Sequence, residues 1–562
     1  MVEVPRASAN EYHWEFLLVN IIYEKPHTKQ VILRGIRFTR TRNTRGILPC
    51  QLNEVCALYD LVKGEEDEAG AVDIGIESVI RTRDSRHTNA LFPAHRANSV
   101  LVQRWKFYRY WSTARDKAQN KSCKHGSIVR LMSKDIRDVT LRVSNDALRS
   151  EFRGGVVPGG SYIGNKTRIP TVDVDEMPNH REHKTTERKP GQKYIVDDMF
   201  CGAGGVSRGI CQSGEGFRLG IACDADAAAC RSYRANFPEA ELKCMGLFEL
   251  TQKLKGSRTR ADIVHLSPPC QVWSPAHTRA GKNDAANVAA LYTCEEILKA
   301  RRPRLSTGEQ TYGLLFDSNE DCFNGLIGQY TRLNYSVTWD MLKFRYYGLP
   351  TSRKRLVWIA SCIGERLPSF PPPTHGYPGL PRELVLRDTL KTISKSHGDP
   401  LHDVNAMLAK GIRATPYDDN KQTGTITTSG SDACHPSGKR HFTRRELAAL
   451  QGFPTKHTFL GTATEMKRQI GNAFPPTVVA TLYKHLEKWL LRQDRVVTAP
   501  GHHYQGPKRK HGVIIISDDD DDENSAKRRQ HNIEGMDNVP VVDDPDSDTE
   551  RGDSSDDEEW NW

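Results

Sequence analysis

The feature that most constrains the fold is a short apolar run that leads into a glycine-rich turn. The segment Lys193–Gly205 is a strand-like run that enters this turn, and a helical pattern begins near Val206. Glycines allow close backbone approach to a ligand, and the N–H groups of the following helix point at it. A second apolar run ends at Asp224, where a carboxylate reaches ribose hydroxyls in nucleoside-binding folds. The turn and the acid predict a nucleoside cofactor, and the glycine spacing disfavours a dinucleotide.

A third strand-like run, further along the chain, ends in a rigid turn that presents one cysteine. The run Ile263–Leu266 is followed by two prolines and then by Cys270. This pattern predicts a buried strand whose carboxyl end opens into a loop, which is where open α/β sheets place their ligands. A cysteine alone is more often a small buried apolar residue than a nucleophile. The role of Cys270 therefore depends on the motifs around it.

The chain divides into segments of different character. Residues 1–150 are rich in strand patterns and predict a β-rich domain, and residues 151–193 have the Gly, Pro and charge content of a linker. From Tyr194 to about Arg492, strand and helix patterns alternate, which predicts an α/β fold with a mainly parallel sheet. Within the first segment, Arg104–Trp111 interleaves aromatic and cationic residues. A core strand is the favoured interpretation there, and base stacking or a methyl-lysine cage is the alternative.

The charge distribution suggests a polyanionic partner. The net charge is +10, but residues 513–562 carry 18 acidic and 4 basic residues and leave +24 on residues 1–512. A body this basic favours nucleic acid, with scattered solvated charge as the alternative. The 13 cysteines form no CxxC pair, so we expect a reducing compartment and no metal site. No apolar run approaches the ~18 residues of a membrane span, and we expect an intracellular protein without a membrane partner.

Further motifs follow the cysteine in a fixed order. They are Gly281–Asp284, Gly308–Thr311, Pro350–Arg355, Arg445–Pro454 and Gln469–Pro476. With the glycine turn and the Pro-Cys pair, this ordered set resembles the cytosine carbon-5 DNA methyltransferases over residues 194–492. The resemblance implies a Rossmann-like class I fold that depends on S-adenosyl-L-methionine and acts on cytosine in DNA, with a small target-recognition region from about Ile363 to Gln422.

The resemblance assigns roles that the chemistry explains. Carbon 5 of cytosine is a poor nucleophile, so a thiolate, here Cys270, adds to carbon 6 and makes carbon 5 reactive toward a sulfonium methyl. Glu309 would protonate or hydrogen-bond ring nitrogen 3. Arg353 and Arg355 would bind the carbonyl oxygen of the base or orient Glu309. The target base must first be flipped out of the duplex. The expected cofactor-binding residues are Phe200, Gly202, Gly204, Asp224, Asp262 and Asn472.

This chain departs from the family pattern at several positions. Gln310-Thr311 replaces the usual Asn-Val after the glutamate, Thr351 replaces the usual Gln, and Ala286 stands near a usual Arg. No acid for the adenine is evident around Met245-Gly246. The Gln-Thr pair resembles the fungal RID-type (RIP-defective) branch, which is linked to silencing of repeated DNA. Two alternatives therefore stay open: a catalytically weak or silent DNA-binding scaffold that recruits silencing factors, and an RNA methyltransferase of the same fold.

The two ends of the chain suggest chromatin and nuclear partners. The order Leu17–Ile22, Arg34–Arg40 and Leu52–Val55 resembles a bromo-adjacent homology domain, which implies histone or other chromatin ligands. In the segment 493–562, Pro507–Lys510 and Lys527–Arg529 have the spacing of a bipartite nuclear import signal. The rest of that segment is acidic and predicts disorder. Within it, Val513–Ile516 precedes an acidic run and resembles a SUMO-interacting motif, with an apolar spacer as the alternative.

Overall fold

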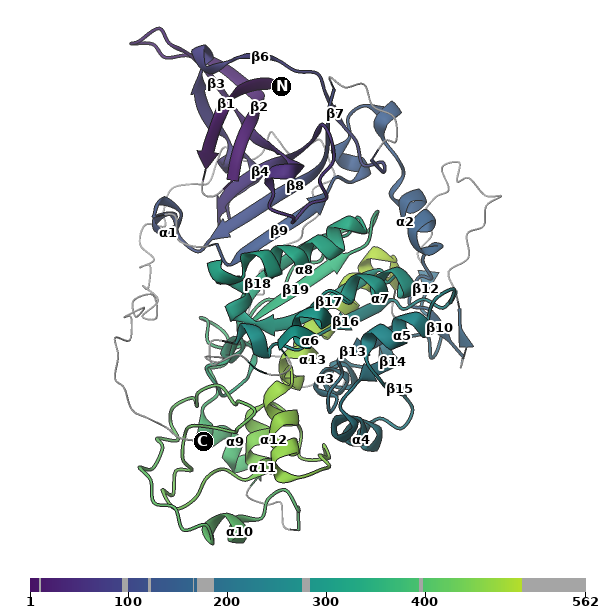
Figure 1. Cartoon of the computed structure of the whole chain (residues 1–562), viewed down its shortest axis with the longest axis vertical. Helices are drawn as coiled ribbons and strands as arrows, with labels where there is room; N and C mark the ends of the chain where they lie inside the picture. Colours follow the sequence, from purple (N-terminus) through teal and green to yellow (C-terminus); the bar gives the residue numbers. More distant parts are fainter. Residues whose placement is uncertain are drawn as a thin grey trace, which may run out of the picture. The chain divides into compact units, whose positions relative to one another are not determined.

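A seven-stranded mixed sheet forms the centre of the second half of the chain (Figure 1). The computed structural model describes residues 1–9, 12–92, 100–119, 123–164, 166–168, 186–274, 281, 284–393 and 398–497. The strands lie in the order β15-β14-β13-β16-β17-β19-β18, and β19 runs in the direction opposite to the other six. They are β13 (Tyr194–Met199), β14 (Phe217–Asp224), β15 (Glu241–Cys244), β16 (Ile263–Leu266), β17 (Leu305–Thr311), β18 (Ser336–Lys343) and β19 (Lys354–Ser361).

The strand order confirms the predicted α/β, Rossmann-like fold. The chain starts in the middle at β13, moves outward to β14 and β15, and then returns to β16 on the other side of β13. The carboxyl ends of β13 and β16 therefore meet at a topological switch point, where open sheets bind their ligands. The glycine turn follows β13 and Cys270 follows β16, so the topology brings both predicted features to this edge.

Helices cover both faces of the sheet because consecutive strand residues, which point to opposite faces, are apolar. Val196 and Ile263 face one way and pack with the helices α3 and α13, whereas Ile195 and Val264 face the other way and pack with α5, α7 and α8. This two-residue period is expected of strands buried on both faces. The helices are α3 (Gly205–Ser213), α4 (Ala227–Asn236), α5 (Leu247–Lys253), α6 (Asp284–Leu291), α7 (Cys294–Arg301), α8 (Glu320–Arg332) and α13 (Pro476–Gln493).

The first 150 residues are β-rich, as predicted, but their sheet continues the central one. Its order is β9-β8-β4-β3-β2-β1-β6, and β9 pairs antiparallel with β18 through Ile128 and Val337. The strands are β1 (Val2–Ala9), β2 (Tyr12–Glu24), β3 (Val31–Arg40), β4 (Glu54–Val62), β5 (Val72–Gly75), β6 (Arg81–Thr82), β7 (Ser85–His87), β8 (Leu101–Trp111) and β9 (His125–Arg130). The chain from Met1 to Ala499 is one compact unit, so the expected separate domain is fused to the second half.

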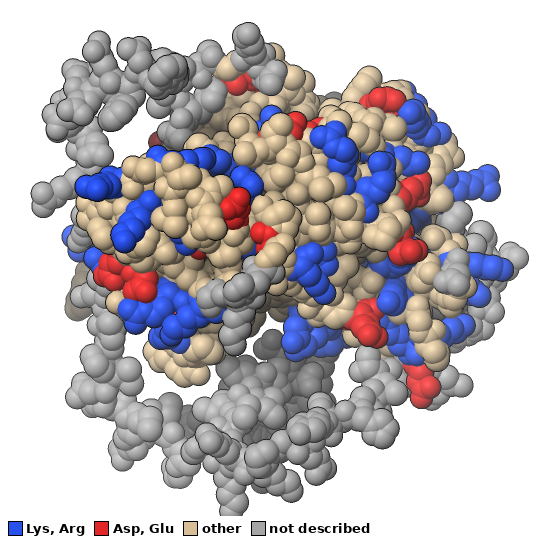
Figure 2. Space-filling model, turned by 90° about the horizontal axis from the view of Figure 1, so that it is seen from below, with Lys and Arg blue, Asp and Glu red and all other residues tan. Residues whose placement is uncertain are grey.

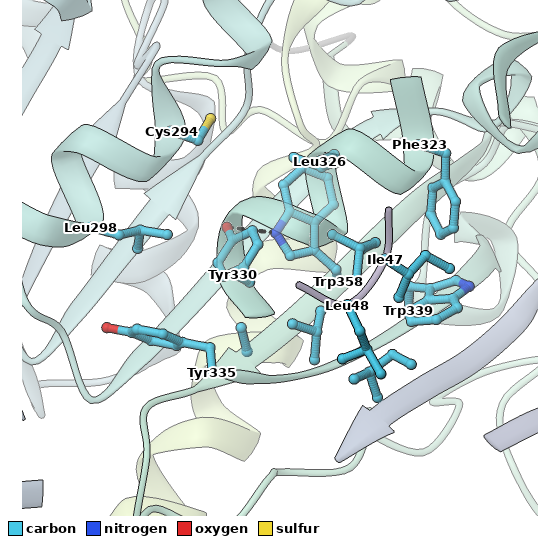
Figure 3. Close-up of a cluster of buried hydrophobic side chains, with 14 of the residues drawn as sticks. Ile47, Leu48, Cys294, Leu298, Phe323, Leu326, Tyr330, Tyr335, Trp339 and Trp358 are labelled. Atoms are coloured by element: carbon cyan, nitrogen blue, oxygen red, sulfur yellow. Dashed lines mark hydrogen bonds between the residues drawn. The ribbon is translucent and has the colours of Figure 1, made fainter. Parts of the chain in front are cut away.

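A shared hydrophobic core reinforces this continuous sheet. Ile47 and Leu48, from the loop between β3 and β4, are buried and lie among side chains of α8, β18 and β19 (Figure 3). Leu326 and Trp339 belong to the same cluster. The hydroxyl of Thr331 also donates to the carbonyl of Ile47. Because Ile47 and Leu48 are buried in the same cluster as these side chains, the β-rich part contributes to the core of the second half.

The aromatic and cationic stretch Arg104–Trp111 is part of the core strand β8. Trp105 and Phe107 are buried, and Arg104 is paired with Glu54 at 2.6 Å. Arg109 is paired with Asp60 at 2.7 Å. Buried cations need such partners because water is excluded around them. The core-strand interpretation is therefore correct, and these side chains are not displayed for stacking on bases.

The segment predicted as a linker packs on the second half. Helix α2 (Asn145–Arg153) crosses the expected boundary at residue 150, and the hairpin of β10 (Tyr162–Ile163) and β11 (Lys166–Thr167) follows it. Beyond β19, the predicted recognition region is mostly irregular and contains α9 (Leu386–Ile393) and α10 (Val404–Leu408). It shares a small core with α11 (Arg444–Leu450) and α12 (Ala463–Asn472). The import signal and Val513–Ile516 lie outside the described residues.

Candidate active site

The four predicted catalytic residues come from three neighbouring strands at the carboxyl edge of β16 and β17. Cys270 lies in the loop after β16, Glu309 lies near the end of β17, and Arg355 lies near the start of β19. Antiparallel pairing places Thr311 opposite Arg355, and Glu309 is two residues away on the same face. The register of β17 and β19 therefore brings the acid and the arginine together.

The carboxylate of Glu309 is buried and forms ion pairs with both predicted arginines. Its Oε1 atom lies 3.0 Å from Nε of Arg355 and 3.9 Å from Nη2 of Arg353. The angles are poor for hydrogen bonds, so within the described residues neither Oε1 nor Nε of Arg355 has an aligned partner. Buried polar groups are normally satisfied. This unsatisfied pair fits a ligand that supplies both a donor and an acceptor, as the edge of a pyrimidine does.

The two arginines have different surroundings. Arg353 is fully buried and donates to the carbonyls of Ile426, Gly471 and Ala473. Burial, reinforced by the neighbouring charge of Arg355, lowers the pKa of Arg353 to about 9. Arg353 thus ties the segment that follows the recognition region, and the end of α12, to the start of β19. Arg355 has its Nε 3.0 Å from Glu309 but not aligned with it, which leaves Arg355 the better placed of the two to contact a ligand.

Cys270 is half-buried at the carboxyl end of β16, and its surroundings hold the thiol in the protonated form. Burial raises the pKa of the thiol above its ordinary value, and the carboxylate of Glu309 raises it further. Arg355 and Arg353 act in the opposite sense and do not cancel the increase. The thiolate is the nucleophile in such chemistry. The raised pKa therefore disfavours the thiolate of Cys270 in the structure as it stands.

A buried histidine supports the start of the cysteine loop, and the sequence analysis missed it. His265 lies within β16, with Nδ1 2.9 Å from Oγ1 of Thr307 and Nε2 hydrogen-bonded to Oγ of Ser267. Burial lowers the pKa of His265 to about 3, so the ring is neutral. A histidine in the middle of an apolar strand was the signal available in the sequence, because a buried polar ring needs partners on both sides.

The glycine turn after β13 forms an open cradle next to this site. Phe200 and Gly202 have positive φ angles of 61° and 53°, and a Cβ at Gly202 would meet no atom within 4 Å. Gly204 also has a positive φ, but a Cβ there would lie 2.3 Å from the Phe237 ring. Gly202 therefore faces the open side of the turn, whereas Gly204 is required for packing. The expected cofactor-binding role fits Gly202 better than Gly204.

Two acids surround the cradle. The carboxylate of Asp224 accepts hydrogen bonds from the backbone N–H groups of Gly202 and Asp226, both at 2.8 Å, and burial raises its pKa. Asp198, which the sequence analysis did not select, is bonded to Ser207 through Oδ2, and within the described residues Oδ1 has no partner. Burial raises the pKa of Asp198 to about 7. An open turn with an unsatisfied acid fits a nucleoside cofactor that carries hydroxyl and amino groups.

The structure contradicts the expectation for Asp262. This residue precedes β16 and so lies at the amino end of the strand, whereas the site is at the carboxyl end. Asp262 is fully buried and accepts hydrogen bonds from Ser161 and from the backbone N–H of Ile195. It anchors the segment predicted as a linker and does not line the cradle.

Other places in the fold hold the last predicted site residue, Asn472, and two departures from the family pattern, Ala286 and Thr351. Asn472 is exposed at the end of α12, and a Cβ added at Gly205 would lie 3.1 Å from the Cβ of the next residue, Ala473. Ala286 is exposed on α6. Thr351 is buried and pairs through a β-bridge with Thr423, directly after the recognition region. Across the described ranges, no group of three His, Cys, Asp or Glu side chains is arranged to hold a metal ion.

The fold and the site define a Rossmann-like methyltransferase with a cysteine at the switch point. The sequence profile described as "C-5 cytosine-specific DNA methylase" matches residues 194–396 and 382–488. This match covers more than half of the chain. The protein therefore belongs to the family of C-5 cytosine-specific DNA methylases, whose members use S-adenosyl-L-methionine as the methyl donor.

Individual relatives cover the same half of the chain. The Type II methyltransferase M1.HphI of Haemophilus parahaemolyticus is 28% identical over 320 residues, which are 51% of this chain and 84% of the relative. M.NgoFVII of Neisseria gonorrhoeae is 26% identical over 333 residues, 52% of this chain and 86% of the relative. Among solved structures, the Entamoeba histolytica methyltransferase EhMeth covers 53% of this chain and 99% of its own, with 19% identity and a TM-score of 0.41.

Proposed function

We propose that this protein methylates carbon 5 of cytosine in nuclear DNA, with Cys270 as the nucleophile and Glu309 and Arg355 as the groups that bind the base. The observation that carries the proposal is the buried pair of Glu309 and Arg355, 3.0 Å apart and without an aligned hydrogen bond, next to the loop of Cys270. S-adenosyl-L-methionine would supply an electrophilic methyl group from the cradle at Phe200, Gly202 and Asp224.

Each of the three residues has a separate role in the addition of the thiol to the base. The sulfur of Cys270 adds to carbon 6 as its thiol proton passes to the carboxylate of Glu309, which then donates that proton or a strong hydrogen bond to ring nitrogen 3. Arg355 holds the carbonyl oxygen of the base and keeps Glu309 in place. Once Glu309 is engaged with the base, its charge no longer opposes the thiolate. Substrate entry would thus favour the form of Cys270 that reacts.

Double-stranded DNA is the proposed substrate because the described surface is rich in cations. Figure 2 shows Lys and Arg side chains spread over one face, with fewer Asp and Glu side chains between them. Phosphate contacts by such side chains release counterions and supply affinity without sequence preference. If single-stranded RNA competes for the site better than duplex DNA, an RNA substrate would replace this proposal.

The biological setting is a further part of the proposal. Gln310-Thr311 supports a place in the fungal RID-type branch and a role in silencing repeated DNA. The β-rich first part supports histone or other chromatin ligands, by its resemblance to a bromo-adjacent homology domain. A pull-down with modified histone peptides tests the second point. Absence of binding to every peptide by the full chain would contradict it.

A silent scaffold is the second candidate function, and one observation favours it. The raised pKa of the Cys270 thiol disfavours the reactive form. Incubation of purified protein with DNA and S-adenosyl-L-methionine, followed by mass spectrometry of the nucleosides, separates the candidates. The proposed enzyme produces 5-methylcytosine, whereas a scaffold binds DNA and leaves its cytosines unchanged.

The acidic tail supports a proposed docking partner of the SUMO type. Val513–Ile516 supplies four β-branched residues for pairing with a sheet edge, and the acids that follow would orient the strand beside a basic patch. Phosphorylation of Ser517 should strengthen this docking. The test is a titration of labelled SUMO with a peptide of residues 508–526. An unchanged spectrum, or an equal response after Ala replaces Ile514, Ile515 and Ile516, contradicts the idea.

A further inference from the structure

The loop that carries Cys270 is hydrogen-bonded at both ends to two consecutive residues of β17. The side-chain amide of Gln310 donates to the carbonyl of Pro268 at 3.2 Å, and the hydroxyl of Thr311 donates to the carbonyl of Trp273 at 3.0 Å. Cys270 lies between these two carbonyls in the chain. Both donors come directly after Glu309, so one strand end supplies the acid and both attachments of the loop.

These attachments are buried and specific. Gln310 is fully buried and Thr311 is 3% exposed, so neither side chain has water as an alternative partner. The Oε1 atom of Gln310 also accepts the backbone N–H of Thr311 at 2.8 Å, which fixes the orientation of its amide. Within the loop, the N–H of Trp273 donates to the carbonyl of Cys270 at 3.2 Å. The loop is thus held at its two ends by side chains of β17, and at the cysteine by a backbone hydrogen bond within the loop.

These two residues are also the positions where this chain departs from the pattern of its family. Valine at position 311 would have no donor for the carbonyl of Trp273, which would stay buried and unpaired. Asparagine at position 310 has a side chain one methylene shorter and would not reach Pro268 in the present backbone. The departures therefore add contacts to the cysteine loop that the usual residues do not make in this geometry.

We propose that Gln310 and Thr311 are positioning residues that hold the Pro268–Trp273 loop at both ends, so that the thiol of Cys270 stays beside Glu309 and Arg355. This inference rests on the proposed function, because it takes Cys270 as the nucleophile. It assigns a purpose to Gln310-Thr311 that differs from loss of activity: the substitutions maintain the reactive geometry and do not abolish it.

The test uses the full chain and two substitutions that remove a donor at nearly constant volume. Thr311→Val removes the hydroxyl, and Gln310→Met keeps the length of the side chain but removes the amide. Each should slow covalent trapping on DNA that contains a mechanism-based cytosine analogue by about three- to tenfold, the effect of one lost hydrogen bond. The affinity for S-adenosyl-L-homocysteine, measured by calorimetry, should stay that of the parent. Thr311→Ser retains the hydroxyl and should restore the parental trapping rate.

Hydrogen–deuterium exchange of the loop provides a readout that does not depend on activity. Exchange of the Trp273 and Ser274 amides should be faster in Thr311→Val than in the parent and in Thr311→Ser. Ser306→Ala is the matched control. The hydroxyl of Ser306 donates to the carbonyl of Val264 at 2.9 Å, between the same two strands but near their amino ends and away from the loop. The control should lower stability without changing exchange of the loop or the trapping rate.

The outcomes separate this inference from the proposed function. If the parent forms no adduct, the proposed function fails. The hydrogen–deuterium exchange of the loop then still tests whether Gln310 and Thr311 hold it. Parental loop exchange in both Thr311→Val and Gln310→Met overturns the inference. A trapping rate that falls equally in Ser306→Ala and Thr311→Val also overturns it, because the loss would then reflect general destabilisation.

Discussion

At the scale of single residues, Glu309 has the largest effect on the site because it acts on both the base and the thiol. Glu309→Gln keeps the shape of the side chain but cannot donate a proton. We expect the rate of addition to fall by about 10²–10⁴, the usual contribution of a general acid. Single-turnover trapping measures this rate, and calorimetry should show unchanged cofactor affinity. A decrease smaller than tenfold would contradict the assigned role.

The pH dependence of Cys270 follows from the signs of its neighbouring charges. Glu309 raises the pKa of the thiol and Arg355 lowers it. Glu309→Gln should therefore move the midpoint of Cys270 alkylation to lower pH, and Arg355→Gln should move it to higher pH. Mass spectrometry of the alkylated peptide across a pH series follows both shifts. Movement of the two midpoints in the same direction would show that these charges do not control the thiol.

At the scale of strands and loops, the buried position of Asp262 at the amino end of β16 predicts a structural role for this residue. Its carboxylate accepts three hydrogen bonds and lies 3.7 Å from the buried Arg153. Asp262→Asn should lower the free energy of unfolding by about 3–5 kcal/mol, since it leaves a buried cation without its partner. Chemical denaturation measures this loss.

The matched variant for Asp262 is Asp224→Asn, at the open turn. Asp224→Asn should weaken the binding of S-adenosyl-L-homocysteine, whereas Asp262→Asn should leave that affinity unchanged once the protein is folded. Isothermal calorimetry at a temperature where both variants are folded makes the comparison. Weaker binding of S-adenosyl-L-homocysteine by Asp262→Asn would show that Asp262 does take part in cofactor binding.

The same two aspartates show how far the sequence could predict the site. Asp224 ends its strand, and residues that end parallel strands gather at one edge of the sheet. Asp262 precedes its strand, so the same rule would have placed it at the opposite edge, and only the family resemblance suggested otherwise. The support from Thr311 to the loop was not predictable, because it depends on a hydrogen bond to a carbonyl in another segment.

The fold was predictable where its cause is local. Alternation of strand and helix patterns in residues 194–492 predicted the parallel sheet, and β branching and aromatic content predicted the β-rich start. The pairing of β9 with β18 was not predictable, since both are ordinary strands in the sequence. Ile47 and Leu48 also reach the core of the second half, and no short pattern in the sequence indicates either contact.

At the scale of the whole molecule, the shared core predicts that the second half does not fold alone. A fragment of residues 194–492 would leave the edge of β18 unpaired and expose the side chains that now cover Ile47 and Leu48. We expect this fragment to aggregate, whereas residues 1–497 should be soluble and unfold in one transition. Calorimetry of both proteins is the measurement. A soluble fragment with the Tm of the longer chain would contradict the prediction.

The acidic tail should oppose DNA binding by the basic body. Residues 513–562 carry a net charge of −14 and compete with DNA for the same cations. Deletion of the tail should therefore leave affinity unchanged or increase it. In a salt titration, log K should fall with log salt by roughly 0.9 for each phosphate contact. Loss of binding on deletion would show that the tail itself contacts DNA.

The central claim is that this chain forms 5-methylcytosine through Cys270. The most direct measurement is nucleoside mass spectrometry of duplex DNA after incubation with the purified protein and S-adenosyl-L-methionine, with Cys270→Ala in parallel. We predict 5-methylcytosine with the parent and none with Cys270→Ala. Equal product from both proteins, or none from a folded parent that binds DNA and cofactor, would contradict the claim.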